Sequence, residues 1–194
     1  MPHPDDRALE RRQGWTGRFR TALQLDLAPT LAELFGLDAK PVWDGSSYAA
    51  TITQGMDCGR DSLVLSQCCH VCQRSVRWDD WLYIRTYHDG GHLFPREQLY
   101  NIKEDPHEQD DVAAKRPDLC ALAAHKLMAW HDDMMATQPK GYTADPMRVV
   151  MAEGGPFHAR GALPAYARRL EATGRAEVAA RLRARHPEAF ATEG

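Results

Sequence analysis

The sequence has no long hydrophobic run and no strong excess of charge. No apolar stretch in its 194 residues approaches the roughly 20 residues that a helix needs to cross a bilayer. With 24 basic and 27 acidic residues the formal net charge is −3, so the overall field attracts neither nucleic acid nor an anionic membrane. Hydrophobic residues make up 43% and charged residues 26%, as in an average globular domain. We therefore expect a soluble globular protein without nucleic acid or membrane as a partner.

A disulfide framework and a secretory leader are also missing. The chain has five cysteines, an odd number, and three of them crowd into residues 68–72, a pattern typical of a reducing compartment. The first six residues are polar and acidic, where an export signal would have basic residues and then an apolar stretch. These features predict a cytoplasmic location. Residues 1–22 carry many charges and no apolar period, so we expect a loop or a segment that needs a partner surface.

A short helix with both ends marked is expected over residues 27–35, where apolar residues recur at helical spacing. Asp26 is expected to cap its N-terminus, and Gly36 to take the left-handed position after its last turn. Residues 38–61 are rich in Gly, Asp and Ser. They predict a connecting loop with one helical turn at 46–52.

The middle of the chain predicts four strands that follow one another in an antiparallel sheet. Runs of β-branched, aromatic and aliphatic residues are separated there by turn signals. The strands are expected at residues 63–65, 75–78, 81–87 and 97–102. Asp79 and Asp80 occupy the place of a two-residue hairpin turn. This turn sets Trp78 opposite Trp81, Val76 opposite Tyr83 and Arg74 opposite Arg85.

The remainder of the chain predicts helices. Apolar residues at spacings of three and four predict a long helix from Pro117 to near Pro139, with one face covering the sheet. Two further helices are expected at residues 162–173 and 175–185. The fold class is therefore α+β, with a four-stranded antiparallel sheet covered by a long helix. The predicted divisions are an N-terminal part at 1–57, a sheet subdomain at 58–138 and a helical C-terminal extension at 139–194.

Four stretches combine helix-start, loop and hairpin signals in a fixed order. Residues 26–31 read Asp-Leu-Ala-Pro-Thr-Leu, and residues 44–47 read Asp-Gly-Ser-Ser. Residues 74–84 form an Arg-x-Val-Arg run, a turn and an aromatic strand, and residues 97–108 contain Leu-Tyr-Asn-Ile and then Asp-Pro-x-Glu. Together they resemble the C-terminal half of the sulfatase family, within the alkaline-phosphatase-like superfamily. The alternative is that they are ordinary capping and turn signals of an unrelated α+β domain.

The resemblance implies a specific chemistry and a missing half. Sulfatases hydrolyse sulfate esters with a cysteine or serine, oxidised to formylglycine, in a Cys/Ser-x-Pro-x-Arg motif. A divalent cation, calcium or magnesium, lies beside it and is held mainly by carboxylates. No cysteine or serine here completes that motif, and the family's paired aspartates have no match. The resemblance therefore implies the substrate-pocket-forming C-terminal portion of a sulfuric ester hydrolase. This portion would be inactive alone, with residues 1–57 a remnant of the α/β catalytic domain and no catalytic residue or cofactor of its own.

The same resemblance implies partners and substrate contacts. The expected partner is an N-terminal catalytic half or a homologous chain, the expected ligand is a small-molecule sulfate ester, and homo-oligomerisation stays open. Strand ends of the C-terminal sheet can edge the substrate cleft. His70, Arg74, His88 and His92 are therefore the candidate substrate-binding residues, which would contact the organic part of the ester.

Two alternatives use the same region differently. Cys69 and Cys72 are followed by His88 and His92 at a spacing that fits a two-cysteine, two-histidine zinc site. The hairpin turn would set Cys72 opposite Tyr87. It would so bring the cysteine pair and the histidine pair to the same end of the two-stranded hairpin. A zinc-stabilised binding module is the first alternative, and a non-catalytic interaction module is the second. The simplest interpretation of the cysteines is that they are small, partly buried residues at a strand end.

Overall fold

The computed structural model describes residues 22–138, 140, 141 and 144–191. The chain divides into two compact units, Met1–Asp61 and Ser62–Gly194. The loop predicted at 1–22 lies outside the described residues, apart from its last residue. No helix in the described part of the chain is both long and apolar enough to cross a membrane.

The first unit contains a 3-10 turn η1 (Gln24–Asp26) and two helices, α2 (Leu27–Leu34) and α3 (Ala49–Gln54). Gly36 has a φ of 69°, and the amide of Leu37 donates to the carbonyl of Ala32, so the predicted left-handed end of α2 is confirmed. The helical turn predicted at 46–52 starts later. The amide of Ser46 donates to the side chain of Asp26 and that of Tyr48 to the side chain of Thr30, and so neither amide enters a helix.

Asp26 precedes α2 as predicted, but its side chain does not cap that helix. Its carboxylate instead accepts hydrogen bonds from the amide of Leu23 at 2.7 Å and of Ser46 at 2.8 Å, and it pairs with the guanidinium of Arg60. The side chain is almost fully buried. The capping prediction was wrong because a distant amide and a cation offered this carboxylate stronger partners than the helix amides.

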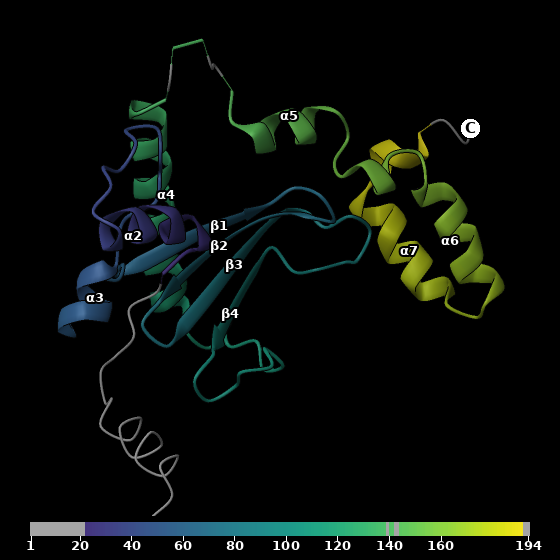
Figure 1. Ribbon diagram of the computed structural model, residues 1–194. Helices are drawn as coiled ribbons and strands as arrows, with labels where there is room; N and C mark the ends of the chain where they lie inside the picture. Colours follow the sequence, from purple (N-terminus) through teal and green to yellow (C-terminus); the bar gives the residue numbers. More distant parts are fainter. Residues whose placement is uncertain (1–21, 139, 142–143, 192–194) are drawn as a thin grey trace, which may run out of the picture. The chain divides into compact units, whose positions relative to one another are not determined.

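The second unit is built on the predicted antiparallel sheet, whose strand order is β1-β2-β3-β4 (Figure 1). The strands are β1 (Ser62–Gln67), β2 (Cys72–Trp78), β3 (Trp81–His88) and β4 (Glu97–Asn101). The three predicted pairs across the β2–β3 hairpin are confirmed. The register shifts between Cys72 and Gln73, so Cys72 lies opposite His88 and not opposite Tyr87. The cause is a β-bulge, which adds a residue to one strand and leaves no signal in local alternation.

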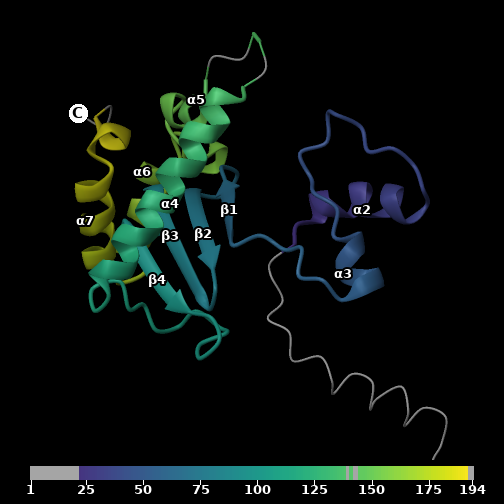
Figure 2. The same cartoon turned by 90° about the vertical axis from the view of Figure 1, so that its left-hand side faces the viewer.

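Helix α4 (Pro117–Ala136) covers one face of the sheet, as predicted (Figure 2). It begins at Pro117 and ends three residues before the predicted Pro139. Alternation along β2 directs every second side chain into the core, and the paired positions Val76, Tyr83 and Leu99 of three strands are fully buried. The buried core comprises Val76, Trp78, Tyr83, Leu99, Cys120, Ala123 and Leu127.

The C-terminal region forms a second, smaller core. Helices α6 (Leu163–Ala172) and α7 (Ala176–Arg185) match the two predicted helices within one residue. Leu93, from the loop between β3 and β4, packs against this core. Helix α5 (Pro146–Ala152) and the 3-10 turns η2 (Phe157–Ala159) and η3 (Pro187–Phe190) were not predicted. The core comprises Ala159, Leu163, Ala167, Leu170, Ala179 and Leu182.

Candidate functional site

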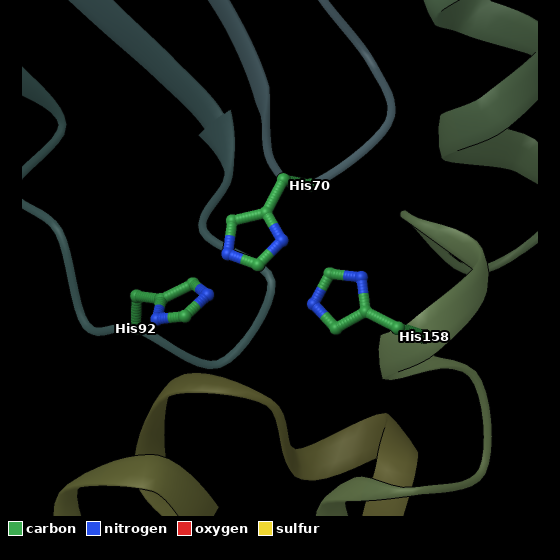
Figure 3. Close-up of side chains that lie close together, drawn as sticks. All are labelled: His70, His92 and His158. Atoms are coloured by element: carbon green, nitrogen blue, oxygen red, sulfur yellow. The ribbon is translucent and has the colours of Figure 1, made fainter.

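Three histidines from three separate segments meet beside one end of the sheet. His70 lies in the β1–β2 connection, His92 in the loop after β3, and His158 in η2. One ring nitrogen from each lies within 4.8 Å of the other two. Figure 3 shows the three rings turned toward a common space. We call these residues the histidine cluster.

The rings of the histidine cluster contact one another and face solvent. The His70 ring is stacked on that of His158 with centroids 4.8 Å apart, and it lies 4.6 Å from that of His92. All three side chains are exposed. Within the described part of the chain, none of their ring nitrogens makes a hydrogen bond to another protein group. The nitrogens are therefore available to a ligand from solution.

The backbone can bring these loops together because residue 90 is a glycine. Gly90 has a φ of 60°, and a Cβ built on it would lie 2.4 Å from the carbonyl oxygen of His70 and 3.2 Å from Nε2 of His158. Any side chain here would therefore push two members of the cluster away.

Replacing Gly90 by alanine is expected to destabilise the second unit by about 2 kcal/mol or more, because left-handed strain and a backbone clash add. The matched control is Gly174→Ala. Gly174 has a φ of 77°, and no atom lies within 4 Å of the position that a Cβ would take there, so this variant has only the conformational cost, about 1 kcal/mol. Urea unfolding of both variants measures the difference. Equal costs would contradict the close approach of the three loops.

His88 belongs to a different network from the histidine cluster. Its Nδ1 accepts the amide hydrogen of Gly90 at 3.0 Å, and its ring lies 4.9 Å from that of His186. Burial, then the neighbouring His186, holds the pKa of His88 below its usual value. Behind it, the buried carboxylate of Asp89 contacts Nε2 of His186 at 2.7 Å. His88 therefore packs as part of the scaffold that positions the loop.

Arg74 lines a pocket on another part of the second unit. Its Nη2 is 2.5 Å from Asp145, its Nε donates to the hydroxyl of Ser66 at 3.3 Å, and the guanidinium lies 5.1 Å from the ring centre of Trp130. The pocket has a volume of about 290 Å³. Because Asp145 already balances the charge of Arg74, the pocket favours an apolar or aromatic group. Its remaining lining includes Cys68, His131, Met134, Met135, Pro146 and Met147.

Two ionisable side chains of this pocket, Asp145 and Cys68, have shifted pKa values. Burial alone would raise the pKa of Asp145, but the hydrogen bonds from Arg74 and from the amide of Met147 outweigh it and leave the pKa lowered. Burial is the main cause that raises the pKa of the Cys68 thiol. Asp145 is therefore an anion and Cys68 a protonated thiol, which is a poor nucleophile.

The structure divides the four predicted substrate-binding residues among three places. His70 and His92 meet in the histidine cluster, Arg74 lines the pocket, and His88 packs against His186. The predicted zinc set of Cys69, Cys72, His88 and His92 is not assembled. No three of those four residues form a ligand group among the residues that the structure describes. The bulge beside Cys72 and the packing of His88 against His186 separate the expected pairs.

His158 was missed by the sequence reasoning. It lies far along the chain from His92, so no ligand spacing connects the two. The one available signal was the preceding pair Gly154 and Gly155, both with φ near 90°. A Cβ on Gly155 would lie 2.5 Å from the ring of His88, so this glycine also marks a close approach.

Several solved structures are similar to part of the chain. A Bacteroides thetaiotaomicron sulfatase described with the metabolism of multiple glycosaminoglycans is 20% identical, with a TM-score of 0.44 over 57% of this chain and 25% of its own. A protein solved with its substrate D-glucosamine-2-N,6-O-disulfate is 16% identical, with a TM-score of 0.49. The similarity covers 61% of this chain and 25% of that protein. A 2-O GAG sulfatase is 23% identical, with a TM-score of 0.43. The similarity covers 69% of this chain and 29% of that protein.

The chain spans 25% to 29% of the length of these three structures. No protein-family model and no curated protein matches the sequence.

Proposed function

We propose that this chain is the C-terminal portion of a sulfatase-family sulfuric ester hydrolase, in which it forms a wall of the substrate pocket. The observation that carries the proposal is the long-range bonding of the stretches that resemble the family. Asp26 of the first stretch binds the amide of Ser46, 20 residues away in the second stretch, and the guanidinium of Arg60, 34 residues away. Thr30 accepts the amide of Tyr48 at 3.0 Å.

These contacts argue against accidental capping and turn signals. An ordinary cap satisfies amides within its own helix turn, whereas the buried Asp26 links three distant parts of the unit. In the fourth stretch, the amide of Leu99 donates to Asp111, 12 residues away, at 3.0 Å. The resembling residues thus support the tertiary structure, which favours a shared fold over coincidence.

The catalytic chemistry is assigned in this proposal to another part of the enzyme. Burial is the main cause that raises the pKa of Cys68, Cys72 and Cys120, so none of these thiols is activated. Calcium and magnesium prefer oxygen ligands, whereas the histidine cluster is an all-nitrogen group. The family's cation therefore does not fit it. Formylglycine and the calcium or magnesium ion would both belong to the N-terminal catalytic half.

An exposed apolar surface on the first unit supports such a partner. Large apolar side chains of and around α2 are open to solvent, including Phe35 at 76% and Val42 at 81% exposure. Several large apolar side chains exposed within one short segment are typical of a contact with another domain or chain. We propose that the catalytic half packs against it. The exposed set is Leu25, Leu27, Leu31, Leu34, Phe35, Leu37 and Val42.

We propose that the four candidate residues His70, Arg74, His88 and His92 serve the substrate from their different positions in the second unit. The pocket beside Arg74 has the volume and apolar lining for the organic part of an ester. His70 and His92 would meet the ester at the loop end, and His88 would hold that loop.

Two methionines of α4 offer a test of the pocket and its control. Met134 lines the pocket and is 42% exposed, whereas Met128, on the same helix, is 65% exposed and does not line it.

The test is to offer 4-nitrophenyl sulfate to the purified 194-residue chain. With calcium and magnesium supplied, we expect no hydrolysis above the buffer rate, since cleavage needs an activated nucleophile. Binding, followed by NMR with EDTA present, is expected with a Kd on the order of 1 mM, because one wall buries only part of the ligand. Met134→Glu should abolish binding by adding a negative charge to the pocket, and the control Met128→Glu should leave it unchanged. Turnover by the chain alone, or binding that survives Met134→Glu, would contradict the proposal.

A further inference from the structure

The histidine cluster has the composition and spacing of a metal site with an open coordination position. Imidazole nitrogens are good ligands for zinc, copper and nickel ions. Three histidines with a fourth position left to water form one of the recurrent arrangements of zinc in enzymes. We infer that His70, His92 and His158 bind one divalent transition-metal ion. This inference rests on the positions of the ligand atoms and does not depend on the proposed function.

The distances are compatible with metal binding after a small closure. With zinc–nitrogen bonds of about 2.0–2.1 Å, tetrahedral geometry places ligand nitrogens about 3.3 Å apart. The three nitrogens lie within 4.8 Å of one another. Each exposed ring can close the remainder by rotation about its two side-chain bonds, because no hydrogen bond from the described residues holds its nitrogens.

The arrangement of the rings suits a cation. An imidazole ring offers the lone pair of an unprotonated nitrogen to a metal, and one such nitrogen from each of the three rings lies near the other two. The loops are also rigidly supported, because Gly90 packs against His70 and His158 and the adjacent Asp89 is buried against His186.

The exposure of the three rings indicates an accessible metal site with an open coordination position. All three rings face solvent, so an ion could enter without local unfolding and would keep a position for water or another ligand. A bound ion would occupy nitrogens of His70 and His92, and an ester could then meet the cluster only at that open position. The three histidines belong to neither of the two hydrophobic cores described above.

Zinc titration of the chain, purified without a histidine tag and freed of metal with a chelator, tests the inference. Isothermal titration calorimetry at pH 7.5 is expected to give one equivalent of zinc with a Kd on the order of 1 µM, as three ligands provide. His70→Ala, His92→Ala and His158→Ala should each weaken binding about 100-fold. The control His125→Ala removes an exposed histidine of α4 and should leave affinity unchanged.

Two further measurements separate this site from the cysteine-containing alternative. Cys69→Ser should retain the wild-type affinity, because the thiol is not a member of the cluster. Cobalt added in place of zinc should give the intense visible absorption of a tetrahedral site, and His158→Ala should lose it. Failure of the wild-type chain to bind zinc, or full affinity in His158→Ala, would overturn the inference. Loss of binding in Cys69→Ser alone would assign the metal to the cysteines instead. Ester binding measured in EDTA is unaffected by either outcome, so the two proposals can fail separately.

Discussion

Replacing Asp89 by alanine is expected to lower the free energy of unfolding of the second unit by about 3 kcal/mol. The carboxylate is 2% exposed, lies 2.7 Å from Nε2 of the buried His186 and 3.3 Å from Nη1 of Arg185, and accepts the amide hydrogen of Gly91 at 2.9 Å. Its removal leaves a buried imidazole and a backbone amide without their acceptor. The loss should appear as a lower midpoint in urea unfolding.

The control for this variant is Asp110→Ala. Asp110 is exposed in the turn before α4, so its removal should change stability by less than about 0.5 kcal/mol. A second readout is local, because Asp89 ties the β3–β4 loop to the end of α7. Limited proteolysis within residues 89–96 should therefore be faster in Asp89→Ala. Unchanged unfolding and unchanged proteolysis would show that this buried network contributes little.

Replacing Asp26 by alanine is expected to have a comparable effect on the first unit, about 3 kcal/mol. The side chain is 1% exposed and holds Leu23, Ser46 and Arg60 together. Hydrogen exchange of the Ser46 amide reports the loss directly, and its protection should fall about 100-fold. Asp38→Ala, at an exposed position of the same unit, should leave that protection unchanged.

The same carboxylate makes the first unit sensitive to acid. Burial would raise the pKa of Asp26, but the hydrogen bonds from Arg60, Leu23 and Ser46 outweigh it and lower the pKa below its usual value. A group with a lowered pKa in the folded state stabilises the fold above its unfolded pKa, near 4, and loses this contribution as the pH falls further. Protection of Ser46 should therefore decrease below about pH 4 in the wild type. In Asp26→Asn this pH dependence should be absent.

The sheet and its covering helix could be predicted from the sequence because their signals are local. A two-residue turn at Asp79 and Asp80 and alternation on both sides of it determine the hairpin register, and Trp78 indeed lies opposite Trp81. The start of α4 at Pro117 follows from the preference of proline for the first turn of a helix. The bulge beside Cys72 has no comparable signal, because it depends on how the strand meets the neighbouring loops.

The histidine cluster depends on long-range packing and could be predicted only in part. His70 and His92 were identified from their places at strand ends, but His158 enters from the C-terminal region through η2. Asp26 illustrates the same limit, since its place before a helix was predicted and its actual partner Arg60 was not. In each case the contact joins segments far apart in the sequence, which local periodicity does not report.

The glycine-rich β3–β4 loop is shared between the two halves of the second unit. Leu93 packs into the core of α6 and α7, a Cβ on Gly91 would lie 2.8 Å from Leu163, and Asp89 binds His186. The C-terminal helices are thus interlocked with the sheet and are not a detachable appendage. A chain shortened before α6 would therefore lose a structural anchor for His92, and the loop that carries this histidine would lose its apolar support from Leu163.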